Sequence, residues 1–165
     1  NLDIAQGGVN DVLAKAVGLE KIESFVLTNA EKGFSLGRIG YLSQVKSLDE
    51  FVMDVKKGLH LSHVRIVRGS NKPVRKVALC SGAGAEFVAK AAFMGADVYL
   101  TGDVKYHEAQ GAVQQGINLI DAGHFGTEFP VVQVLADYLT AEAAKMKKDL
   151  EVITDNISQD FFEFN

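Results

Sequence analysis

The chain has 165 residues, of which 47% are hydrophobic, and its formal net charge is −4 with a pI near 5.5. This composition fits one core of ordinary size and offers no basic surface for nucleic acid or anionic lipid. The single cysteine, Cys80, excludes an internal disulfide, and no apolar run approaches the roughly 20 residues that cross a bilayer, so we expect a soluble, cytoplasmic protein.

The first part of the chain predicts two helices and three strands. In order, they are helix 9–17, strand 24–29, strand 34–45, helix 47–59 and strand 63–69. Asn10 or Asp11 is available to cap the first helix. Ser47, with Glu50 three residues later, predicts a capping box for the second.

From residue 76 onward, strands and helices alternate regularly. The expected elements are strand 76–82, helix 85–95, strand 96–103, helix 106–116, strand 117–123, helix 128–149 and strand 150–158. Such alternation with short turns predicts an α/β fold with a mixed, largely parallel sheet and helices on both faces.

Loops that leave the carboxyl ends of such strands form the usual binding crevice. Four can be identified: SGAGAE (81–86), TGDVKYHE (101–108), DAGHFGTE (121–128) and TDNIS (154–158). The first could offer backbone N–H groups to an anion. It lacks the lysine of a P-loop, however, so we favour a tight turn.

The third loop carries His124 and Glu128. Thr127 is a good N-cap, which predicts that a helix starts at Glu128 and that His124 lies in the loop before it. The imidazole and the carboxylate could then converge on a metal ion. Alternatively, Glu128 complements the helix dipole and His124 bonds a neighbouring carbonyl.

Two ligands do not hold a catalytic metal, and the candidate partners are Asp3, Asp103, His107 and Asp121. A site of imidazole and carboxylate suits zinc, manganese, iron or cobalt better than calcium. Asp103 could cap the next helix or orient a ligand. His107 shares its helical face if the helix has begun, although a cap and a surface histidine explain the pair equally well.

Two other features have simpler explanations. His60 and His63 resemble a ligand pair, but in a strand their spacing puts them on opposite faces, so we discount them. Cys80 ends an apolar strand and is expected to be a buried core residue.

Four segments, in this order, resemble the GTP cyclohydrolase 1 type 2-like family, also described as NGG-interacting-factor-three-like proteins. They are NLDIAQGGVND, SGAGAE, LTGDVKYHEA and LIDAGHFGTE. The resemblance implies an α/β fold, two divalent transition metal ions and a homo-hexamer. It further implies that Asp3, His124 and Glu128 are metal ligands and that Asp103 and His107 have supporting or proton-transfer roles.

The resemblance also implies that this chain is the C-terminal portion of a longer protein. Residues 1–30 would then be the remnant of an N-terminal domain, a ligand loop plus a helix, and residues 31–165 the C-terminal α/β domain. The expected function is metal-dependent hydrolysis of a nucleotide or another phosphorylated small molecule. The alternative is a non-catalytic metal-binding protein or oligomeric scaffold.

Overall fold

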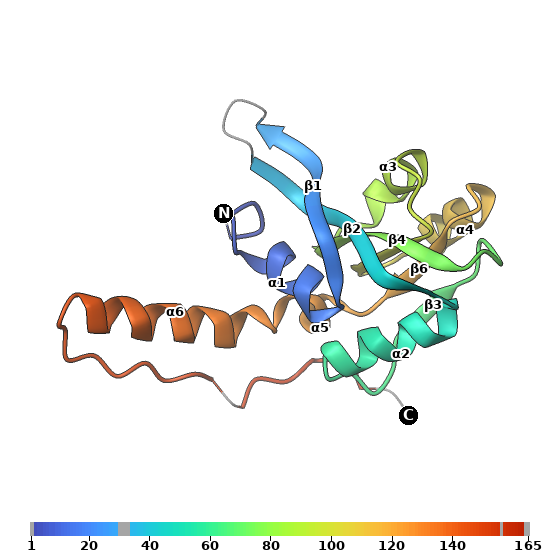
Figure 1. Ribbon diagram of the computed structural model, residues 1–165. Coiled ribbons are helices and arrows are strands. Elements are labelled where there is room, and N and C mark those ends of the chain that lie inside the picture. The colour runs from blue at the N-terminus through green and yellow to red at the C-terminus, as the bar shows by residue number, and fades with distance from the viewer. Residues whose placement is uncertain (1, 30–33, 156, 164–165) are drawn as a thin grey trace.

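The computed structural model describes residues 2–29, 34–155 and 157–163. The elements are, in order, α1 (Val9–Ala16), β1 (Leu19–Asn29), β2 (Phe34–Lys46), α2 (Leu48–Gly58), β3 (Arg65–Val67), β4 (Val74–Ala83), η1 (Ala85–Phe87), α3 (Val88–Phe93), β5 (Val98–Gly102), α4 (Tyr106–Gln114), β6 (Asn118–Asp121), α5 (His124–Glu128) and α6 (Val131–Lys145) (Figure 1). Within the described ranges, every helix is too short or too polar to cross a membrane.

The six strands form one mixed sheet in the order β1-β2-β4-β5-β6-β3. This confirms the predicted α/β class. The β4–β5 and β5–β6 pairs are parallel, but the other three pairs are antiparallel, so the sheet is less parallel than the alternation suggested. A parallel pair needs a crossover, which α3 and α4 supply, whereas β1 and β2 are close enough in sequence to pair as a hairpin.

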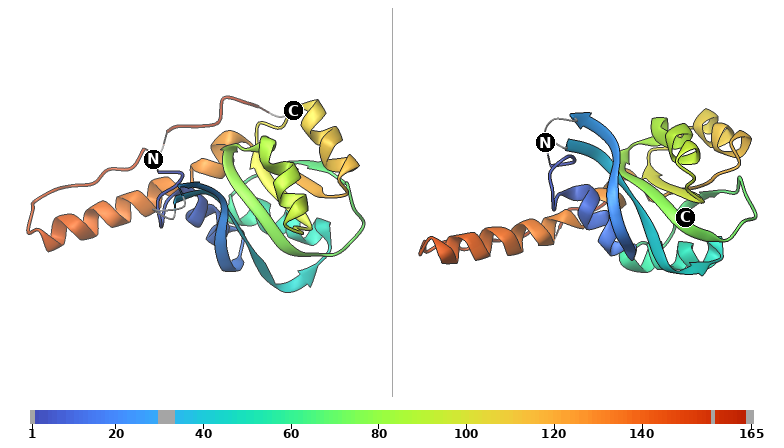
Figure 2. Two further views of the ribbon diagram at one scale, coloured as in Figure 1. Left: turned by 90° about the horizontal axis from the view of Figure 1, so that it is seen from above. Right: turned by 45° about the horizontal axis from the view of Figure 1, so that its top comes forward.

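Helices cover both faces of the sheet, as predicted (Figure 2). Leu13 of α1 and Phe51 of α2 are fully buried in the core on one face. On the other face, Val88 of α3 and Ala112 of α4 pack with Tyr99 of β5.

Cys80 belongs to the second of these cores, as expected. Burial raises the pKa of its thiol to about 11, so the side chain is an apolar packing group at neutral pH.

The caps of the first two helices differ in how well the sequence predicted them. The capping box of Ser47 and Glu50 is present at α2. In α1, however, Gly8 is the N-cap, and neither Asn10 nor Asp11 caps the helix. Asn10 bonds instead to the backbone of Asp3 and Ser81, and Asp11 bonds to Arg38 and to the Gly7 N–H.

The expected strand over 150–158 is wrong: none of its described residues belongs to a strand. Helix α6 ends at Lys145 and projects from the body of the protein (Figure 1), and the segment after it runs back along the helix. Ile153 and Ile157 are 80% and 88% exposed. A strand needs a neighbouring strand to satisfy its backbone hydrogen bonds, and this segment pairs with no strand of the sheet. TDNIS is therefore not a loop at the end of a strand.

The expected domain boundary between residues 30 and 31 lies outside the described residues. On the N-terminal side, β1 begins at Leu19, five residues earlier than predicted, and pairs with β2. Leu13 of α1 and Leu19 of β1 share one core with Phe51 of α2. The start of β1 was not predicted because its sequence, LEKIES, is rich in charged residues. An edge strand with one face in water tolerates such residues.

Candidate functional site

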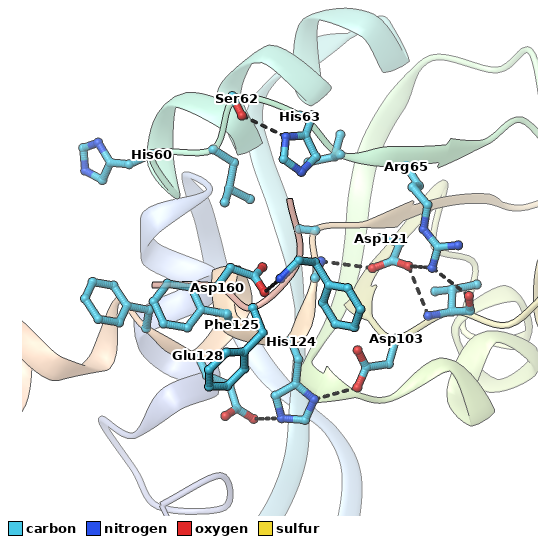
Figure 3. Close-up of a pocket in the computed structure, with 18 of the residues that line it drawn as sticks. His60, Ser62, His63, Arg65, Asp103, Asp121, His124, Phe125, Glu128 and Asp160 are labelled. Atoms are coloured by element: carbon cyan, nitrogen blue, oxygen red, sulfur yellow. Dashed lines mark hydrogen bonds and ion pairs between the residues drawn. The ribbon is translucent and has the colours of Figure 1, made fainter. Parts of the chain in front are cut away.

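A pocket of about 1050 Å³ opens where β5 and β6 end (Figure 3). Asp103 follows β5, and His124 and Glu128 come from α5, which follows β6; all three side chains line this pocket. Parallel strands place their carboxyl ends at one edge of the sheet, so polar residues far apart in sequence meet there. The predicted crevice thus coincides with a cavity of ligand size.

Gly82, near the end of β4, lies directly against this cluster. A Cβ atom at Gly82 would be 2.5 Å from Oε1 of Glu128 and 3.1 Å from Nε2 of His124, and the backbone φ is +61°. The Gly82 N–H donates to the Thr127 hydroxyl at 2.9 Å, and the Gly84 N–H donates to the Thr101 hydroxyl at 3.0 Å. These contacts support the tight-turn interpretation of SGAGAE, since two of its N–H groups are bonded within the protein.

Helix α5 starts earlier than predicted and contains both candidate ligands. It runs from His124 to Glu128 with Gly123 as its N-cap, so His124 is its first residue and not a loop residue. Thr127 is not an N-cap, because its hydroxyl lies 2.9 Å from the carbonyl oxygens of Gly123 and His124 and accepts from Gly82. Pro130 occupies the N-cap position of the separate helix α6, without a side-chain capping bond.

The His124 ring lies between two carboxylates (Figure 3). Its Nδ1 is 2.7 Å from Oδ2 of Asp103, and its Nε2 is 3.2 Å from Oε1 of Glu128 four residues along the helix. The bond to Asp103 is the largest cause of a raised pKa at His124, followed by desolvation, which lowers it, and the charge of Glu128, which raises it. A neutral ring that donates Nδ1–H to Asp103 directs the Nε2 lone pair toward Glu128.

Replacing Asp103 by asparagine is expected to lower the pKa of His124 toward its ordinary value of 6.5. The carboxylate favours the charged imidazolium, so its stabilising effect is present below that value and is lost as the pH rises through the raised pKa. NMR titration of the chelator-treated protein measures this pKa. Asp137→Asn, in exposed α6, is the control; equal titration of His124 in both variants would contradict the prediction.

Asp121 connects the loop of Asp103 to the start of α5, and its carboxylate is used in these bonds and not as a metal ligand. It is 7% exposed, and its carboxylate accepts the N–H groups of Val104 at 3.1 Å and Gly123 at 3.0 Å. It also bonds to Arg65, whose guanidinium donates to the Val104 carbonyl at 2.8 Å. These bonds fix the loop of Asp103 against the start of α5.

Asp3 lies in the N-terminal loop before α1 and does not line the pocket. Its side chain is partly buried, and its negative charge is one of the smaller causes of the raised pKa of His124. In the part of the chain that the structure describes, no three His, Cys, Asp or Glu side chains form a group that could hold a metal ion. The structure therefore brings His124 and Glu128 together as a donor pair, with Asp3 on a neighbouring loop.

His107 does not share this environment. It is exposed on α4 beside the ring of Tyr106, with the two ring centres 6.0 Å apart, and it is absent from the pocket lining. Helix α4 begins at Tyr106, so Asp103 precedes it and the two residues do not share a helical face. Proton transfer by His107 stays a prediction from the resemblance.

The opposite wall of the pocket contains residues that we had discounted. His60 and His63 line it, and both precede β3, which starts at Arg65. These histidines therefore do not lie on opposite faces of a strand, and the reason for discounting them was wrong. The Ser62 hydroxyl lies 2.8 Å from Nδ1 of His63. The spacing of the two histidines in HLSH could have indicated this pocket wall, but the predicted strand over 63–69 led us to discount it.

Aromatic residues from two distant segments also line the pocket. Phe125 of α5 stacks on Phe129, with ring centres 4.6 Å apart. Phe161 and Phe162, near the C-terminus, are 100% and 74% exposed and lie at the same pocket. Sequence patterns gave no indication of this approach, because it depends on the path of the chain after α6.

Comparisons with known proteins identify the family of this chain. The profile of the Duf34/NIF3 (NGG1p interacting factor 3) family matches residues 1–160. A GTP cyclohydrolase 1 type 2 homolog from Staphylococcus epidermidis is 36% identical over 140 residues, or 85% of this chain and 38% of its own length. A protein of the same description from Clostridium perfringens is 29% identical over 99% of this chain and 62% of its own length.

The fold matches solved structures as well. A Bacillus cereus protein related to NIF3 superposes with a TM-score of 0.93 at 24% identity, over 99% of this chain and 71% of the other. This likeness shows the fold. The chain thus spans between about two fifths and two thirds of the length of the two curated relatives above. The match of the family profile to nearly the whole sequence establishes that the chain belongs to the Duf34/NIF3 family.

Proposed function

We propose that the chain is the metal-binding part of a metal-dependent hydrolase. The observation that carries this proposal is the pair formed by His124 and Glu128, which Asp103 orients at the wall of a pocket of about 1050 Å³. Imidazole nitrogen and carboxylate oxygen form a donor set suited to zinc, iron, manganese or cobalt. Gly82 leaves room for that pair where any side chain would collide with it.

The roles of the residues follow from these positions. His124 and Glu128 would hold the metal, with Asp3 contributing from its loop, and Asp103 would keep the imidazole in the ligating tautomer. A bound divalent ion supplies a Lewis acid that polarises substrate oxygen atoms and acidifies water. We assign Asp103 a positioning role, because its carboxylate is occupied by Nδ1 of His124.

The proposed substrate is a nucleotide or another phosphorylated small molecule. Two curated relatives carry the description GTP cyclohydrolase 1 type 2 homolog, which supports a nucleotide. The pocket supports the same class, since it combines exposed phenylalanine rings with His60, His63 and Arg65. Rings stack on planar bases, and imidazole and guanidinium N–H groups can donate hydrogen bonds to phosphate oxygens.

A two-metal centre needs more ligands than Asp3, His124 and Glu128 supply, so we propose it for the complete protein and its assembly. Projecting helix α6 supports a homo-oligomer, because Val134, Tyr138 and Leu139 on it are 40%, 60% and 49% exposed (Figure 1). An isolated helix of this length is marginal in water and gains stability from packing.

Removal of Glu128 tests the proposal. In the complete, metal-loaded protein, Glu128→Ala is expected to lower metal content and to reduce turnover of a nucleotide panel by more than about 100-fold, since even partners of metal ligands contribute about 10- to 100-fold. Elemental analysis and product chromatography measure the two effects.

The matched control is Glu151→Ala, at an exposed position outside the pocket lining. Turnover that is equal in the Glu128 and Glu151 variants would refute hydrolysis at this site. If the Glu128 variant loses metal but the unchanged protein shows no turnover, the result would instead support the metal-binding or scaffold role.

A further inference from the structure

Asn10 is a buried polar residue that the proposed chemistry does not use directly. It lies in the first turn of α1 and is 1% exposed. Its Nδ2 donates to the backbone carbonyl of Asp3 at 2.9 Å, and its Oδ1 accepts from the backbone N–H of Ser81 at 2.9 Å. One side chain thus connects the loop that carries Asp3 to the end of β4.

Both connected segments reach the candidate site. Ser81 directly precedes Gly82, against which the side chains of His124 and Glu128 lie. On the other side, the loop around Asp3 belongs to no strand, and a backbone bond from Val9 N–H to the Leu2 carbonyl, 3.3 Å long, closes it on itself. The Asn10 bridge therefore sets how far the Asp3 loop stands from the end of β4.

The chemistry of the bridge requires a carboxamide. The Asp3 group is a carbonyl acceptor and the Ser81 group is an N–H donor, so the bridging side chain must donate at one end and accept at the other. An aspartate of the same shape would still accept from Ser81 but would set a carboxylate oxygen against the Asp3 carbonyl. An alanine would leave both backbone groups unpaired in a buried place.

We propose that Asn10 is a positioning residue that holds the Asp3 loop against the end of β4, on which the side chains of His124 and Glu128 lie, so that the Asp3 carboxylate can join this pair on a metal ion. This inference rests on the proposed metal-binding function. Asn10 touches neither metal nor substrate and acts through the backbone of Asp3. Its effect on metal affinity is consequently expected to depend on the Asp3 carboxylate.

Cobalt(II) titration of the metal-stripped protein, followed by visible absorption, tests the dependence. Asn10→Asp is expected to weaken Co²⁺ binding about tenfold or more, in the range known for partners that orient ligands. In an Asp3→Ala background, the same change is expected to have no further effect. Asn10→Ala is measured in parallel, and circular dichroism confirms that each variant is folded.

The outcomes separate the inference from the function beneath it. An equal loss in both backgrounds, or unchanged Co²⁺ binding by both Asn10 variants, would overturn the positioning role, since a merely structural residue weakens binding whether or not Asp3 is present. Absence of Co²⁺ binding by the unchanged protein would instead refute the proposed metal site and the inference with it. If Asn10→Ala unfolds, the test rests on Asn10→Asp, which keeps the shape of the side chain.

Discussion

Gly82→Ala is expected to weaken metal binding strongly while leaving the protein folded. The new Cβ would lie 2.5 Å from Oε1 of Glu128, so the carboxylate must move away from His124. Alanine at a φ of +61° adds backbone strain of about 1–2 kcal/mol. Urea unfolding and Co²⁺ titration measure the two effects separately.

Gly95→Ala is the matched control for this prediction. Gly95 also has a positive φ, +73°, but nothing lies within 4 Å of the position its Cβ would take. The control is expected to lose a similar amount of stability and to retain metal affinity. Equal Co²⁺ affinity in the two variants would show that the close approach of Gly82 does not shape the donor pair.

Arg38→Leu is expected to cause the largest loss of stability, about 3 kcal/mol, because it leaves the largely buried Asp11 carboxylate without its counter-charge. The side chains of Arg38 and Asp11 are 8% and 17% exposed, with Nε and Oδ1 2.5 Å apart. Urea unfolding at neutral pH measures the loss. Replacing Asp11 by asparagine in the same chain is expected to recover part of it by removing the stranded charge.

The exposed pair of Arg68 and Asp49 is the control for this effect. Its N–O distance is also 2.5 Å, but its side chains are 53% and 72% exposed, so Arg68→Leu is expected to cost less than about 1 kcal/mol. Similar losses in Arg38→Leu and Arg68→Leu would contradict the role given to burial.

The Asp11 pair also has a defined pH dependence. Desolvation raises the pKa of Asp11, but the bonds from Arg38 and from the Gly7 N–H outweigh it, and the net pKa is lowered. The pair therefore stabilises the protein above the ordinary pKa of 3.8, and this stability is lost as the pH falls through the lowered value. The penalty of Arg38→Leu should accordingly shrink in acid.

The sequence predicted the regular part of the fold well because its signals there are local. The capping box of Ser47 and Glu50 involves neighbouring residues, and the apolar runs that became β4, β5 and β6 are buried on both faces. Strand direction was harder to predict. Periodicity is the same in parallel and antiparallel strands, so the edge strands were not recognised as antiparallel.

The approximate site was also predictable, since loops after parallel strands meet at one edge. This topology placed Asp103, His124 and Glu128 in one region, and all three line one pocket. It could not place His124 in α5 or exclude Thr127 as a cap, because the Thr127 hydroxyl bonds to Gly82, 45 residues away. It likewise missed the pocket wall at His60 and His63, which depends on where β3 begins.

By itself, the sequence determined the α/β class, the order of most elements and, through the resemblance of its motifs, the family to which the chain belongs. Tertiary structure alone decided which of its polar residues meet. Asp121 bonds to Arg65 and two backbone N–H groups, and Asn10 bonds to the backbone of Ser81, 71 residues away. Buried polar groups must find partners wherever the folded chain provides them, and those partners are set by packing and not by neighbouring residues.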